Sequence, residues 1–157
     1  MITDNFLRLS GSLTAGSATG QTITATANST NVVDLSLARD VGEGTDLYVQ
    51  FTVGPANFAT GTSLTPTVVV AENDALTTNA ITIGTGGTIL TAVLVAGYTF
   101  AVRLNPIVGS LGKRYLGVIY TVGGSNFTSA TITADIVTEI QDGKKYYASG
   151  IPTLSNT

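Results

Sequence analysis

The sequence predicts an all-β protein, a single antiparallel β-sandwich of jelly-roll type with an arm at each end. Three observations lead to this prediction. Apolar and polar residues alternate with a period of two in several segments, which is the pattern of half-buried strands. Thr, Val and Ile are enriched in those segments, and branched side chains suit a pleated surface. Glycine-containing turns separate the segments, and none shows the 3.6-residue apolar stripe of a surface helix.

The clearest strand pattern covers residues 46–53 (DLYVQFTV), and residues 99–104 and 128–138 repeat it. Side chains alternate across a strand, so each of these segments has an inward and an outward face. The core is expected to contain Val49, Phe51, Phe100, Val102, Val118, Ile132 and Ile136. The outward faces are expected to carry Tyr48, Gln50, Thr52, Thr131, Thr133 and Asp135.

Shorter apolar runs rich in β-branched residues predict further strands at 22–27, 32–37, 67–71, 80–83, 89–95 and 115–122. These strands form one domain over residues 1–142, because a chain of 157 residues suits a single compact unit. Within it, residues 10–21 (SGSLTAGSATGQ) are expected to be a flexible loop, since they are Gly-, Ser-, Thr- and Ala-rich. Residues 143–157 are expected to form a C-terminal arm or tail.

The composition points to a protein that binds other proteins. Only 11% of the residues are charged, against about 25% in ordinary domains, and 43% are hydrophobic, with a mean hydropathy of +0.35. So few charges cannot cover the surface of a monomer in the usual way, and exposed apolar surface generally meets a partner. We therefore expect a homo-oligomer, with a two-fold dimer as its form.

Other partners are disfavoured by charge and hydropathy. The formal net charge is −3 and there is no basic stripe, so nucleic-acid binding is not expected. The longest apolar stretch, about residues 89–96, is too short to cross a membrane, and the N-terminal residues do not resemble a signal peptide. The lack of cysteine fits synthesis in a reducing cytoplasm.

The residues needed for most enzyme chemistry are missing. There is no histidine and no cysteine, which removes the usual general base and the commonest transition-metal ligands. We therefore expect no enzymatic activity, no cofactor and no tightly bound metal. Two acidic loops remain open as Ca²⁺ sites or as a carboxylate pair for hydrolysis, because carboxylates serve both purposes. They contain Asp40, Glu43 and Asp46 in the first, and Glu72 and Asp74 in the second.

Both chain ends are candidate recognition elements. The N-terminal candidates are Ile2, Phe6, Leu7 and Arg8, in a dense apolar segment that also contains Leu9 and precedes the Gly/Ser-rich loop. The C-terminal candidates are Lys144, Lys145, Tyr146, Tyr147 and Ile151. Tyrosine buries a large ring and still presents a hydroxyl, which suits interfaces, and lysines could steer the tail to an acidic surface. The alternative is that the first segment is simply the first strand and that the tail is frayed.

Three stretches together resemble the capsid cement, or decoration, proteins of tailed bacteriophages, of the type found in short-tailed Bordetella phages. They are residues 1–12 (MITDNFLRLSGS), 38–53 (ARDVGEGTDLYVQFTV) and 113–137 (KRYLGVIYTVGGSNFTSATITADIV), whereas residues 55–95 show no match. The resemblance implies a jelly-roll domain on the outer surface of the virion head, often dimeric and without catalytic residues. It also implies binding across neighbouring major capsid proteins, which clamps the shell against the pressure of packaged DNA.

A carbohydrate- or receptor-binding β module of a phage fibre or surface protein is the alternative function. Sugar-binding jelly rolls present flat aromatic platforms, and the strand patterns contain Tyr48, Tyr98, Tyr115 and Tyr120. There is no tryptophan, and some of these tyrosines are expected to pack inside. Exposed aromatic rings around a groove would favour this alternative over a cement protein.

Overall fold

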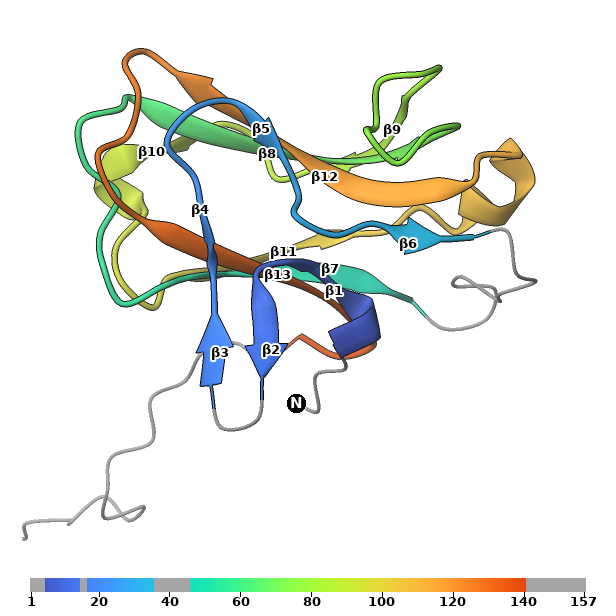
Figure 1. Cartoon of the computed structure of the whole chain (residues 1–157), viewed down its shortest axis with the longest axis horizontal. Coiled ribbons are helices and arrows are strands. Elements are labelled where there is room, and N and C mark those ends of the chain that lie inside the picture. The colour runs from blue at the N-terminus through green and yellow to red at the C-terminus, as the bar shows by residue number, and fades with distance from the viewer. Residues whose placement is uncertain (1–4, 15–16, 36–45, 141–157) are drawn as a thin grey trace, which may run out of the picture.

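The computed structural model, which describes residues 5–14, 17–35 and 46–140, is a sandwich of two β-sheets (Figure 1). Every strand pair in the described residues is antiparallel. The long strands alternate between the sheets: β7, β11 and β13 lie in one, and β8 and β12 lie in the other. This alternation is the connectivity of jelly-roll proteins. The prediction of an all-β, antiparallel sandwich is therefore confirmed.

The first sheet has five strands in the order β1-β13-β7-β11, with β4 paired to β13. Its three longer strands correspond to the three clearest alternating patterns of the sequence. The strands are β1 (Arg8–Ser10), β4 (Gln21–Thr22), β7 (Tyr48–Val53), β11 (Thr99–Arg103) and β13 (Thr131–Val137).

The second sheet has six strands and is built around the long pair β8–β12, with β5 and β6 paired to β12 and β9 and β10 paired to β8. One of its two longest strands, β8, begins four residues before the predicted start at residue 67. The strands are β5 (Ala27–Asn28), β6 (Val33–Asp34), β8 (Ser63–Ala71), β9 (Ile81–Thr85), β10 (Ile89–Leu90) and β12 (Tyr115–Gly123).

The core lies between the two sheets and contains the predicted residues. Six of the seven are buried, and Phe100 is half-buried at the edge of the core, where its ring stacks on Phe51 at 4.8 Å between centroids. Tyr120 meets Phe51 edge-on and is wholly buried. Its hydroxyl lies 2.7 Å from the Ser10 Oγ, so the polar end of this ring is satisfied inside the protein.

The strand predicted over residues 89–95 is wrong beyond Leu90. The chain continues into the 3-10 helix η2 (Thr91–Val93), and the Leu94 amide donates to the Thr91 carbonyl. The apolar residues of this segment do not alternate, and the chain must turn here to cross to the other sheet. Two other short 3-10 helices are η1 (Asn5–Leu7) and η3 (Pro106–Leu111).

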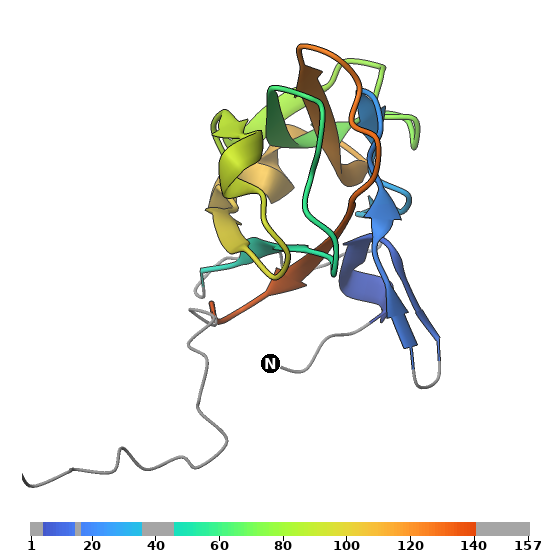
Figure 2. The ribbon, with the colours of Figure 1, turned by 90° about the vertical axis from the view of Figure 1, so that its left-hand side faces the viewer.

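The loop predicted over residues 10–21 contains a small hairpin, β2 (Ser12–Thr14) with β3 (Ser17–Thr19). The hairpin projects from the sandwich (Figures 1 and 2). Gly11 allows it to form, because its φ of +91° suits glycine and an added Cβ would sit 2.2 Å from the Thr19 carbonyl oxygen. Residues 12–14 and 17–19, whose sequence favours a strand only weakly, thus pair because the backbone turns at Gly11.

Candidate protein interface

The N-terminal candidates fall into an exposed turn followed by a buried strand. Phe6 is 84% exposed and Leu7 is 36% exposed, both in η1, which lies beside β13. Leu9, in the following strand β1, is fully buried in the core. The segment is therefore not an arm from Arg8 onward: it is the first strand of the sandwich and presents two apolar side chains just before it.

Arg8 is a buried structural residue and not part of the exposed surface. Its side chain is 5% exposed and its Nε donates to a carboxylate oxygen of Asp135 at 2.7 Å. Asp135 was expected to face solvent, but it lies on β13 as the register partner of Arg8 and is also buried. A buried carboxylate needs a charged partner, and Arg8 supplies one through two nitrogens, Nε and Nη2. Gln50, also expected to face outward, is the register partner of Asp135 on β7 and is buried too.

The remaining predicted interface residues lie outside the described part of the chain. They are Ile2, Lys144, Lys145, Tyr146, Tyr147 and Ile151. The last described residue, Ile140, is 49% exposed and follows β13. Their role in recognition stays a prediction.

Charged residues gather at one end of the sandwich, which we call the charged end. Arg103 pairs with Asp46 at 2.6 Å, Lys113 with Glu72 at 2.6 Å, and Arg114 with Asp34 at 2.9 Å. Hydrogen bonds from Lys113 and from Asn79 lower the pKa of Glu72. Together with the Arg8–Asp135 pair, these contacts engage every arginine and lysine among the described residues.

The acidic loops do not form a metal site in the part that the structure describes. Asp46 and Glu72 are each engaged by a cation, and no three His, Cys, Asp or Glu side chains gather within the described ranges. Asp40 and Glu43 lie outside those ranges. The Ca²⁺ hypothesis for the first loop therefore remains a prediction.

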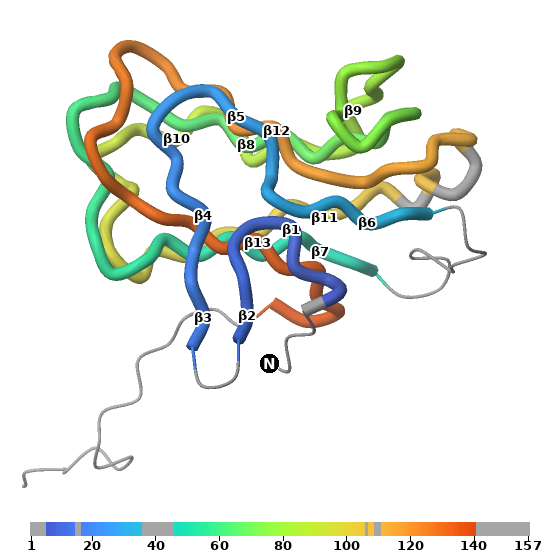
Figure 3. The backbone as a smooth tube through the Cα atoms, viewed as in Figure 1, coloured from blue at the N-terminus to red at the C-terminus, as the bar shows by residue number. Residues whose placement is uncertain are grey.

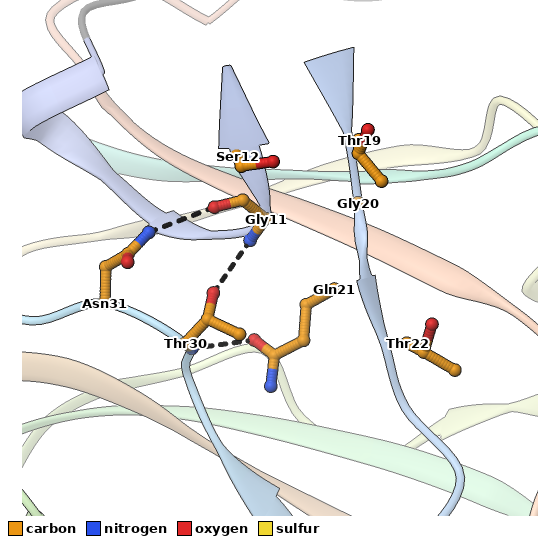
Figure 4. A pocket seen from close by; sticks show the side chains of 8 residues that line it. All are labelled: Gly11, Ser12, Thr19, Gly20, Gln21, Thr22, Thr30 and Asn31. Atoms are coloured by element: carbon orange, nitrogen blue, oxygen red, sulfur yellow. Dashed lines mark hydrogen bonds between the residues drawn. The ribbon is translucent and has the colours of Figure 1, made fainter. Parts of the chain in front are cut away.

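A shallow hollow of about 430 Å³ lies at the root of the β2–β3 hairpin (Figure 4). Its polar groups are used by the protein itself: the Gly11 amide donates to the Thr30 Oγ1 at 3.0 Å, and the Thr30 amide donates to the Gln21 Oε1 at 2.9 Å. No lining residue is titratable or aromatic, so the hollow offers neither acid–base chemistry nor a stacking platform. It is lined by Gly11, Ser12, Thr19, Gly20, Gln21, Thr22, Thr30 and Asn31.

The tyrosines do not form an exposed platform either. Tyr120 is buried, as was expected for some of them, and burial raises the pKa of its hydroxyl while the bond to Ser10 lowers it by less. Tyr48, Tyr98 and Tyr115 are half-buried. The ring of Tyr98 packs against Phe100, and Arg114 lies 5.0 Å above the ring of Tyr115.

The described residues form a β-sandwich with internal ion pairs and scattered exposed apolar side chains. The comparison with known families adds to this description. The model of the Bbp16 family matches residues 17–136, and the chain therefore belongs to this family of Bordetella phage proteins. No curated protein matches the chain. No helix in the described part is long and apolar enough to span a bilayer.

Proposed function

We propose that the protein is a capsid cement protein, which binds the outer surface of a phage head and clamps neighbouring major capsid proteins. Packaged DNA pushes outward on the shell, and a clamp across the joints adds buried surface where the shell would open. Each contact can be weak, because many copies attached to one lattice act together. The proposal includes no catalytic step and no cofactor.

Membership in a phage protein family and the exposure of Phe6 support this proposal. An aromatic side chain that is 84% exposed is costly to leave in water, and aromatic residues are enriched at protein interfaces. Arg8, two residues later, ties the following strand to Asp135, so the aromatic group stands on an anchored base. A rigid base lowers the entropy lost on binding.

The carbohydrate-binding alternative has less support. Glycan sites on β-sandwiches rely on exposed aromatic faces, and the hollow beside the hairpin has none. The tyrosines in the strands are half-buried or buried. No feature of the described residues favours sugars over a protein partner.

The experiment is to add the purified protein to DNA-filled heads that lack it. We expect saturable binding and a higher temperature of DNA release from the decorated heads. Deleting residues 146–157 should leave the β-domain folded, as judged by circular dichroism, and should weaken binding. Heads that neither bind the full-length protein nor gain heat resistance would contradict the proposal, as would specific binding to a glycan array.

A further inference from the structure

Among the described residues, the end of the sandwich opposite the charged end carries no charged side chain. It is formed by three loops, residues 54–62, 90–98 and 123–130, which we call the uncharged end. The strand register brings them together, because β7 and β12 end here and β8 begins here, paired at its start with β10 (Figure 3). The whole stretch from residue 75 to residue 102 also lacks a charge.

Main-chain hydrogen bonds fix these loops to one another. The Phe58 amide donates to the Leu94 carbonyl at 3.0 Å, and the Thr128 amide donates to the Ala59 carbonyl at 3.1 Å. Beneath them, the buried rings of Phe58 and Phe127 meet edge-on at 4.8 Å between centroids. Gly61 is required for this packing, because a Cβ there would lie 2.4 Å from the Phe127 ring.

One residue of the uncharged end is held in a strained conformation. Thr60 has a φ of +74°, which is a true outlier for a β-branched residue. Its hydroxyl donates to the Asn126 carbonyl at 2.7 Å, and its carbonyl accepts from the Ser125 hydroxyl at 3.1 Å. Such strain costs about 1–3 kcal/mol and persists only where the surroundings fix it, often at a binding site. The shape of this end is therefore defined by contacts within the protein.

The same end presents aliphatic side chains to solvent. Leu90 is 57% exposed, Val93 is 43% exposed and Val95 is 45% exposed, all within six consecutive residues. Between them, Leu94 is fully buried and anchors the loop. A rigid, apolar and uncharged surface of this kind loses little entropy and little hydration when it is covered by another protein.

We propose that the protein stands on the phage shell through this uncharged end, with Val93 and Val95 packed against an uncharged, apolar face of the shell protein. Charge complementarity identifies the partner. A charged group buried here would lose its hydration and find no opposite charge, so the partner face must be uncharged. The protein's own charged end cannot be that partner, which excludes head-to-tail association of copies through this surface.

This inference rests on the proposed cement function and adds the face that makes the contact. It also orients the molecule: the ion-paired end, with Arg103, Arg114 and their acids, points away from the shell toward solvent. Phe6 precedes β1 on that half of the molecule, so in this orientation it meets a neighbouring protein beside the contact and not the shell face beneath it. A symmetric pair of copies that joined through their two uncharged ends would hide the same surface. That arrangement would overturn the proposal and is one outcome of the test.

The test uses full-length protein and heads that lack it, with the variants Val93→Asp, Val95→Asp and the double variant. Both side chains are partly in solvent, so the fold is expected to persist, and thermal unfolding checks this. The matched control is Ile107→Asp, because Ile107 is 49% exposed and lies in η3, on the connection between the charged-end residues Arg103 and Lys113. Binding is measured by co-sedimentation with heads, and oligomeric state by analytical ultracentrifugation.

We expect each single variant to weaken binding more than about tenfold, as truncation of a central apolar contact does, and the control to change it less than about twofold. Wild-type binding should hardly change between about 0.05 and about 0.5 M NaCl, because no charge takes part. If wild type binds and the valine variants bind equally well, this surface is not the contact. If the variants change the oligomeric state, copies meet here instead. If wild type itself does not bind, the cement function fails first.

Discussion

The two ends of this sandwich are held together by different kinds of interaction. At the uncharged end, loops are held by main-chain hydrogen bonds and by the buried pair of Phe58 and Phe127. At the charged end, three ion pairs join neighbouring strands and loops, and the carboxylates of all three are at least 39% exposed. Water and salt reach the ion pairs, whereas the ring pair of Phe58 and Phe127 is buried.

The difference suggests that the uncharged end provides a surface of fixed shape, whereas the charged end provides solubility. Hydrogen bonds between uncharged groups and buried aromatic packing hold a surface in one conformation without depending on ion pairs, which suits a contact with another protein. Exposed ion pairs contribute little to stability, typically up to about 1 kcal/mol, but charged side chains keep a surface hydrated and discourage association. We therefore assign rigidity to one end and solvent exposure to the other, and the following changes test that assignment.

The largest effect is expected from Phe127→Ala at the uncharged end. Removing a buried ring that packs against Phe58 and Gly61 should lower the free energy of unfolding by about 4 kcal/mol. Urea unfolding followed by circular dichroism measures this. The control is Phe6→Ala, whose ring is 84% exposed, with an expected change within about 0.5 kcal/mol. Equal effects of the two changes would show that the aromatic pair does not hold this end.

Arg8→Ala is expected to have the next largest effect, because it breaks the ion pair that lies between the ends. It leaves Asp135 buried without its cation, which should cost about 3 kcal/mol in urea unfolding. Replacing both partners with apolar residues, Arg8→Met with Asp135→Leu, should restore most of that loss. A double variant no better than the single one would mean that the loss comes from packing and not from the unpaired charge.

Much of the fold follows from the sequence because the strong signals are local. Residues 46–53, 99–104 and 128–138 alternate clearly, and each became a strand of the same sheet. The start of β8 was missed because Pro66 lacks an amide proton and argues against a strand. In the structure Pro66 is the register partner of Tyr120, and its carbonyl accepts from the Gly86 amide, on the side away from β12. Because the nitrogen and the carbonyl of one strand residue point to the same side, the pairing of β8 with β12 needs no amide proton from Pro66.

The interface was less predictable because it depends on contacts far apart in the chain. Arg8 and Asp135 are separated by 127 positions, so nothing near Arg8 shows that its charge is used inside. The uncharged end likewise joins three loops that only the strand register brings together. A signal was present: each of the three loops lies in a long stretch without any charge, over residues 47–71, 75–102 and 115–134. Reading charge-free turns as well as charged ones would have pointed to this surface.

Tyr120→Phe tests the core that both ends share. The change removes a hydroxyl bonded to Ser10 at 2.7 Å and should cost about 1 kcal/mol at neutral pH. Burial raises the pKa of Tyr120, so above about pH 10 the unfolded chain ionises and the folded one does not. Stability from this group is thus complete below that pH and is lost as the pH rises. Urea unfolding at pH 9 and 11 should show a smaller alkaline loss in the variant, and an unchanged loss would mean that another group causes it.

The smallest effect is expected at the charged end, from Glu72→Gln. The bonds from Lys113 and Asn79 lower the pKa of Glu72 below its ordinary value of 4.5, so the carboxylate favours the folded state above that pH. This contribution is lost as the pH falls through the lowered value. Because the group is exposed, we expect only a small fall of the melting temperature at pH 7 in low salt, and none in high salt.

Asp74→Asn is the matched control for that change, because it removes one negative charge from the same loop without breaking the Lys113–Glu72 pair. General charge repulsion would make both variants gain stability in low salt, since the net charge is −3. A pair-specific contact would make only Glu72→Gln lose stability, and only above the lowered pKa. If Glu72→Gln instead destabilised the protein as much as Phe127→Ala, at any salt concentration, the charged end would be as firmly built as the uncharged one. Rigidity would then no longer distinguish the face that we place against the shell.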